Sequence, residues 1–276
     1  MQRRTLVLLL VLATVLACAG AWIVLNRATG AASGDGHGGV TTHPLPPFRR
    51  IAIEGSAEVT LVAAVAETAS VSVPAKSSGT VILEVRDDTL TVQINDARRW
   101  WQLPGARSAK QARVTIGFRQ IDSVELAGNV RLHAAALRTP SLSVVAHGAA
   151  TLDIDRLDTD LLQLTGAGAV KADVAGRAAE QQIELAGAGV FRGSELAGER
   201  VRVVVSGAGK ASVRAAQTLD VAISGAGLVD YAGEPKVTQQ ISGAGKIRRK
   251  SADDRGPVHI RIALPAAVAP PAPQPG

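Results

Sequence analysis

The stretch Val203–Val213, "VVVSGAGKASV", contains the pattern that decides the fold. Apolar residues alternate up to a Gly-Ala-Gly turn, and a lysine follows the turn. A strand that enters a glycine loop with a lysine is also typical of a phosphate-binding loop. That loop needs a glycine five residues before the Gly-Lys pair and a Ser or Thr after the lysine. Val204 and Ala211 occupy those positions, so the phosphate-loop interpretation fails.

The same pattern occurs seven times along the chain. Its first glycines recur at intervals of about 19 residues and are Gly128, Gly148, Gly166, Gly187, Gly207, Gly225 and Gly243. Alternating apolar residues on either side of the glycines indicate short strands with one buried face. The sequence therefore predicts an all-β protein, a β-solenoid in which each period forms one coil and pairs with its neighbours about 4.8 Å away.

The Gly-Ala-Gly is expected at a corner of each coil, because a positive φ or close backbone stacking excludes larger side chains there. The predicted corner glycines are Gly166, Gly168, Gly187, Gly189, Gly207, Gly209, Gly225, Gly227, Gly243 and Gly245. We expect the solenoid to span residues 47–262, with an irregular cap at 47–118 and the glycine repeats at 121–250. The pair Asp87–Asp88 between two alternating runs predicts a hairpin. A Pro/Ala-rich tail at 263–276 is predicted to be disordered.

The N-terminal residues 1–25 predict export. Two arginines precede an apolar run about long enough to cross a bilayer as a helix. Three interpretations stay open: an uncleaved signal-anchor, a cleaved signal peptide, and a lipoprotein lipidated at Cys18. Residues 26–46 read as a flexible linker. The body is expected in the envelope, either periplasmic on an inner-membrane anchor or at the outer surface.

Composition narrows the function classes. Hydrophobic residues make up 46% of the chain but aromatic residues only 3%, and the formal net charge is +6. Few aromatic rings are available for base stacking, so nucleic acid is not an expected partner. A mildly positive field suits acidic lipids or polysaccharides equally well. With a single cysteine, no intramolecular disulfide can form.

The segments "FRRIAIEGSAEVTL", "LTGAGAV", "LAGAGVF", "VSGAGKA" and "ISGAGLV" resemble the bacterial DUF2807 family, described as an auto-transporter adhesin head GIN domain. The resemblance covers roughly residues 47–250. It implies a right-handed single-stranded β-helix in an exported envelope protein and implies no enzyme activity. Two coils, "LAGNV" and "AHGAA", depart from the family pattern because they lack the second glycine.

Two groups of residues are candidate partner-binding sites. Arg98, Arg99, Trp100 and Trp101 interrupt the strand pattern and form either an exposed ligand patch or a plug for the end of the solenoid. Lys210, Lys246, Arg248 and Arg249 could line up on neighbouring coils as a site for an anionic polymer. Such a stripe is also typical of a solvated face that protects a sheet edge.

Acidic residues offer a different chemistry. Asp153, Asp155, Asp158 and Asp160 lie within ten residues, and some β-helix enzymes that act on polysaccharides use carboxylates on such faces. A groove with converging carboxylates would favour that enzyme class, and a smooth face would exclude it. His37, His43, His133, His147 and His259 show no ligand spacing typical of a metal site. No metal or cofactor is predicted.

Together these observations predict a non-enzymatic, exported binding or adhesion module of the cell envelope. It would be tethered to the membrane by its N-terminal segment and would bind a protein or polysaccharide through repeated weak contacts. The alternatives are a periplasmic scaffold or envelope-stress component and, less favoured, a polysaccharide-acting enzyme.

Overall fold

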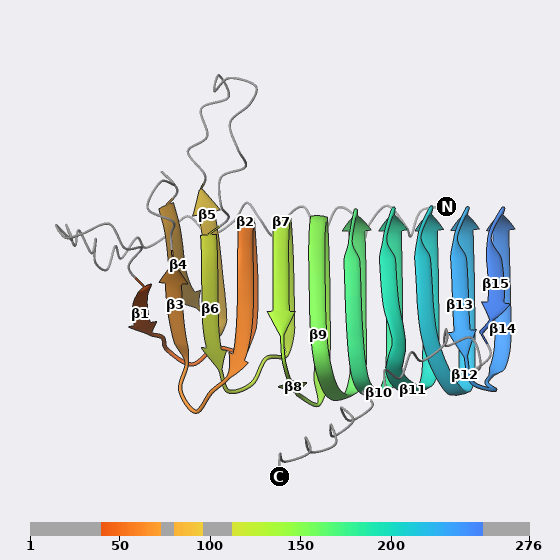
Figure 1. The fold of residues 1–276 in the computed structure, drawn as a ribbon, viewed down its shortest axis with the longest axis horizontal. Helices are drawn as coiled ribbons and strands as arrows, with labels where there is room; N and C mark the ends of the chain where they lie inside the picture. Colours follow the sequence, from red (N-terminus) through yellow and green to blue (C-terminus); the bar gives the residue numbers. More distant parts are fainter. Residues whose placement is uncertain (1–39, 73–79, 96–111, 251–276) are drawn as a thin grey trace, which may run out of the picture. The chain divides into compact units, whose positions relative to one another are not determined.

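The computed structural model describes residues 40–72, 80–95 and 112–250, all within one compact unit, His37–Gly276 (Figure 1). The described residues form a single 15-stranded sheet. The strands in chain order are β1 (Val40–Pro44), β2 (Arg50–Ala63), β3 (Thr68–Ser72), β4 (Thr80–Arg86), β5 (Thr89–Asn95), β6 (Ala112–Phe118), β7 (Ser123–Ala134), β8 (Leu137–Arg138), β9 (Ser141–Gly168), β10 (Lys171–Gly187), β11 (Val190–Gly207), β12 (Lys210–Gly225), β13 (Leu228–Ala232), β14 (Lys236–Gly243) and β15 (Lys246–Arg249).

The predicted β-solenoid is present. From β2 onward each coil pairs in parallel with the next, in the order β2, β7, β9, β10, β11 and β12, and Figure 1 shows these strands side by side. Strands such as β9, with 28 residues, bend around the corners of a coil instead of ending at them. Because every coil pairs backbone with backbone, the sequence need only place apolar side chains inward at alternate positions.

The core is a stack of small aliphatic rows. In β11, Val201, Val203 and Val205 are at most 2% exposed, while the residues between them face outward. The alternation changes phase at Ser194–Glu195, where two consecutive residues are exposed, and the strand register shifts at the same place. These phase changes mark corners, so a coil consists of short straight runs around one interior.

A column of glycines marks one corner in every coil. It contains Gly55, Gly128, Gly148, Gly168, Gly187, Gly207, Gly225 and Gly243, all with φ between +94° and +121°. From Gly128 onward six turns of 18–20 residues separate them. We call these eight residues the corner column. A Cβ added to any member from Gly128 onward would lie 2.4–2.9 Å from the carbonyl oxygen of the preceding member, so close stacking excludes larger residues.

One corner differs from the prediction. Repeat alignment made Gly166 the equivalent of Gly187, but the structure pairs Gly187 with Gly168 and places Gly166 beside Leu185. Gly166 therefore occupies an inward position two residues before the corner. In that coil Val170, two residues after the corner, fills the space. In the next coil the large and small residues change places, since Leu185 stands two residues before the corner and Gly189 two residues after it.

Antiparallel strands lie at the N-terminal end of the solenoid. The predicted hairpin is present, since β4 pairs with β5 across a turn in which Asp87 and Asp88 both have positive φ. β5 and β6 both pair with β2, β3 pairs with β6, and β1 pairs with β3. At the opposite end, β14 pairs with β12 and β15 with β13.

Several predicted segments lie outside the described residues: the N-terminal segment 1–25, most of the 26–46 linker, and the tail 263–276. Within the residues that the structure does describe, no helix has the length and apolar character to span a membrane.

Candidate functional site

The outer face that follows the corner column carries several of the solenoid's ion pairs. Counting five residues on from each corner glycine from Gly128 onward gives one outward column of side chains, which we call the position-5 column. Strand register places these residues next to one another on successive coils: His133, Asp153, Asp173, Arg192, Ser212, Asp230 and Arg248. The column therefore carries two acidic residues, then a basic one, and after Ser212 another acidic and another basic residue.

A groove of about 670 Å³ opens on this face. Four successive coils contribute its polar lining: His133 from β7, Asp153 and Asp155 from β9, Asp173 from β10, and Arg192 and Glu195 from β11. The groove lies where strand register shifts near Val174 and Gly193, so the local bending of the coils coincides with the concavity.

Charges in the groove are only partly compensated. Asp173 accepts hydrogen bonds from Arg192, whose Nη1 lies 3.2 Å from Oδ2, and forms an ion pair with Lys171 at 3.0 Å. His133 Nε2 lies 3.8 Å from Asp155 Oδ2. Asp153 and Glu195 form no ion pair within the described residues. The groove therefore offers a free acceptor, Asp153, at its middle, and both a free acceptor, Glu195, and the Arg192 guanidinium at its β11 side.

This arrangement suits binding better than glycoside hydrolysis. A glycosidase needs one carboxyl group held away from water so that it keeps its proton, besides a second carboxylate at a defined separation. None of the four carboxylates of the groove is buried, and Asp173 is engaged by two cations. In the described part of the chain, no group of three or more His, Cys, Asp or Glu residues is arranged to hold a metal ion.

The structure divides the four predicted aspartates. Asp153 and Asp155 line the groove, as a groove-type site requires, but Asp158 and Asp160 lie in a separate depression with Arg138 and Thr139. There Arg138 Nε donates to Asp158 Oδ2 at 2.9 Å. Convergence of all four carboxylates does not occur.

The predicted basic residues are interleaved with acids. Asp230 forms ion pairs with both Lys210, at 3.5 Å, and Arg248, at 2.9 Å, and Arg249 pairs with Glu234 at 2.6 Å. Lys246 belongs to the same outward column as Lys210, but Leu228 lies between them.

The remaining predicted residues fall in two groups. Arg98, Arg99, Trp100, Trp101, Cys18, His37 and His259 lie outside the described residues. His43 is exposed on β1, and His147 is exposed next to the corner column.

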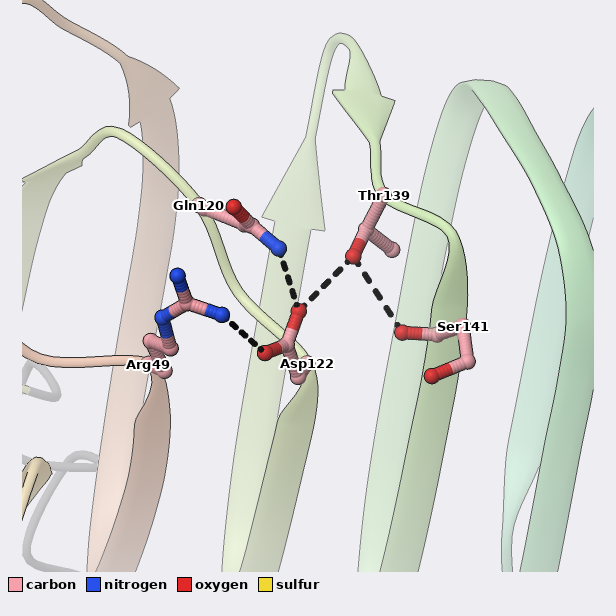
Figure 2. Close-up of polar contacts among 5 residues, drawn as sticks. All are labelled: Arg49, Gln120, Asp122, Thr139 and Ser141. Carbon is pink, nitrogen blue, oxygen red and sulfur yellow. Dashed lines mark hydrogen bonds and ion pairs between the residues drawn. The ribbon is translucent and has the colours of Figure 1, made fainter.

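A polar cluster fixes the junction between the N-terminal strands and the repeats (Figure 2). Gln120 and Thr139 donate hydrogen bonds to Asp122 Oδ1 at 3.0 and 2.9 Å, and Arg49 donates to Oδ2 at 3.4 Å. Burial raises the pKa of the Asp122 carboxyl, but these hydrogen bonds and the Arg49 charge outweigh burial and hold the pKa below its usual value. The Thr139 hydroxyl also lies 3.2 Å from the Ser141 carbonyl oxygen.

Sequence reasoning missed His133 as a groove residue, together with Asp173, Arg192 and Glu195. The signal was present in the chain, because His133, Asp173 and Arg192 each stand five residues after a corner glycine. With Gly166 as the origin, Asp173 falls seven residues later and the column is broken.

Comparison with known proteins relates this fold to others. The sequence model of the DUF2807 family, described as "Putative auto-transporter adhesin, head GIN domain", matches residues 47–235. A crystal structure named a putative adhesin from Bacteroides fragilis NCTC 9343 aligns with a TM-score of 0.67 at 19% identity, covering 77% of this chain and 95% of that chain. A putative adhesin from Parabacteroides merdae ATCC 43184 gives 0.60 at 18% identity, covering 79% and 98%.

A third structure, named a putative lipid binding protein from Parabacteroides distasonis ATCC 8503, gives a TM-score of 0.54 at 17% identity, covering 79% of this chain and 98% of that chain. At these identities the likeness establishes the fold alone. None of the curated proteins matches the chain.

Proposed function

Because this chain belongs to the DUF2807 family, we propose that it is a non-enzymatic binding module of adhesion type, exported to the cell envelope. Its fold would be the right-handed single-stranded β-helix that the family resemblance implies. The N-terminal segment 1–25 would tether it to the membrane, as an uncleaved anchor or through a lipid on Cys18.

The observation that carries the proposal is the groove on the position-5 face. It runs across four coils, its polar side chains come from different coils, and two of their carboxylates have no counter-ion in the described part of the chain. Exposed carboxylates and a guanidinium exchange hydrogen bonds readily with hydroxyl groups. The ligand that this favours is an extended, hydroxyl-rich polysaccharide, which meets one coil after another and gains avidity from several weak contacts.

The binding test uses the full-length chain and a panel of immobilised glycans. The double variant Asp153→Asn/Glu195→Gln keeps the shapes of both side chains but replaces the two carboxylates by neutral amides. We expect at least about a tenfold loss of apparent affinity for the glycan. Asp158→Asn is the matched control, because it removes a carboxylate from the same strand outside the groove. Equal loss in both variants would place the binding site elsewhere.

Two further measurements test the rest of the proposal. Incubation with any glycan that binds should release no new reducing ends; their release would establish an enzyme. Protease treatment of intact cells, with permeabilised cells as control, distinguishes the two locations. Protection until permeabilisation would replace surface adhesion by a periplasmic scaffold role.

A further inference from the structure

The two ends of the solenoid differ. At the N-terminal end, antiparallel strands continue the sheet beyond the coils. At the C-terminal end, β14 pairs only with β12 and β15 only with β13 among the described residues, so one edge of each strand is open. An open edge presents unpaired N–H and C=O groups that attract another strand.

The interior of the last coil is also open. Strand register places Val237, Gln239 and Ile241 of β14 in line with inward residues of β12 that are at most 3% exposed. Ile241 itself is 40% exposed, and every residue of β14 except Val237 is classed as exposed. One further strand would bury this row.

The chain that follows supplies a matching segment. Residues 251–276 lie outside the described residues, and within them Pro257–Arg261 reads "PVHIR", with Val258 and Ile260 alternating with polar residues. This period of two is that of a strand with one buried face. We propose that Pro257–Arg261 binds the open edge of β14 as the last strand of the solenoid.

Chain length permits this placement. Arg249 ends β15, which leaves seven residues before Pro257 to reach the next run of the coil. The coil of β11 makes the corresponding passage with the six residues between Gly193 and Arg200.

The positions of the inward residues and the length of a coil together select one strand register for the segment. The inward residues of β14 are odd-numbered and the apolar residues of the segment are even-numbered, so the offset must be odd. Corner glycines recur every 18–20 residues, which leaves 19. That offset places Ile260 beside the exposed Ile241 and Val258 beside Gln239. It also aligns Ile262 with the corner glycine Gly243, where a side chain does not fit, so the strand has to end at Arg261.

The prolines on either side explain why the sheet would stop there. A proline lacks the N–H that a central strand needs, and it is tolerated on an edge strand. Pro257 opens the segment, and Pro265 follows soon after its end. The segment would therefore cover β14 while offering a poor edge to a further chain.

Hydrogen–deuterium exchange of the full-length chain tests the proposal. We expect peptides from β14 to exchange at least about tenfold faster in Ile260→Lys than in the wild type, since the lysine cannot enter the apolar row. Arg261→Gln is the control, because its side chain would face outward, and it should exchange like the wild type. Peptides from β10 and β11 should be unchanged in both variants, which shows that the coils remain folded.

A chain that ends at Lys250 gives a second readout. Its β14 peptides should exchange as fast as those of Ile260→Lys, and sedimentation should detect self-association through the uncovered edge. Fast exchange of β14 in the wild type would overturn the proposal, as would slow exchange that neither change affects. Slow exchange that is lost on dilution would assign the edge to a second copy of the chain and also overturn it.

Discussion

Alanine should affect stability very differently at the two glycines of "TGAG", Gly166 and Gly168. In Gly168→Ala the new Cβ would lie 2.5 Å from the Gly148 carbonyl oxygen at a φ of +114°. A positive φ costs about 1–3 kcal/mol for a residue with a Cβ, and overpacking against fixed backbone costs about 1–3 kcal/mol more. We expect a loss of about 2–6 kcal/mol in the free energy of unfolding.

Gly166→Ala is the matched comparison. Its Cβ would meet only side-chain atoms of Val170 and Leu185, at 3.2 Å or more, and its φ lies outside the positive region. Reduced freedom of the unfolded chain offsets some of this crowding, so stability should stay within about 1 kcal/mol of the wild type.

The assay is urea and thermal unfolding of both full-length variants, followed by far-ultraviolet circular dichroism. Gly168→Ala should melt at least about 2 °C below Gly166→Ala, at about 2–4 °C for each kcal/mol in a chain of this size. If Gly166→Ala is as damaging as Gly168→Ala, or more so, the assignment of Gly168 to the corner column is refuted.

Three further predictions concern polar side chains. Asp122→Asn should lower stability at pH 7, because a carboxyl whose pKa is lowered by folding stabilises the fold above its ordinary pKa of 3.8. The difference in stability between variant and wild type should shrink in an acid titration, once the pH falls below 3.8 and the wild-type carboxyl is protonated. A difference that stays constant with pH would contradict the argument. Asp230→Asn should cost about 1–3 kcal/mol in urea titrations, since a nearly buried carboxylate bonds Arg248 and Lys210; no change would mean that solvent screens both pairs. Gln181→Met should stay within about 1 kcal/mol of the wild type by thermal unfolding. Among the described residues the buried Gln181 Oε1 has no hydrogen-bond partner, and Nε2 donates only two long bonds, to the Ala178 and Leu196 carbonyl oxygens at 3.4 and 3.5 Å. A larger loss would show that these bonds, or an internal water on Oε1, stabilise the fold.

The period of the solenoid could be predicted from sequence because it depends on local features, a small turn and alternating apolar residues. The register of one coil could not. "TGAG" contains two glycines that both satisfy the local pattern. Gly166 is the inward one because Val170 and Leu185, the second from the neighbouring coil, occupy the space beside it. That information lies between coils and not within one.

The groove was only half predictable for the same reason. Asp153 and Asp155 are close in sequence and drew attention as a pair, and they do line it. Asp173 lies one coil from Asp153 and Arg192 lies two coils from it, and the three form one row only when the coils are in register. Asp158 shows the converse, since nearness in sequence did not bring it to the groove, because a corner separates it from Asp155.

The corner column has a consequence for how such chains can change length over evolutionary time. Every member of the corner column from Gly128 to Gly243 stacks on the member before it through the same backbone contact. A coil therefore meets its two neighbours through nearly identical surfaces. A gene segment that encodes one whole coil can thus be duplicated or lost without creating a new kind of interface. Insertion of one or two residues inside a coil instead reverses or displaces its inward side chains. Relatives of this protein should therefore vary in steps of whole coils and tolerate odd insertions only at corners.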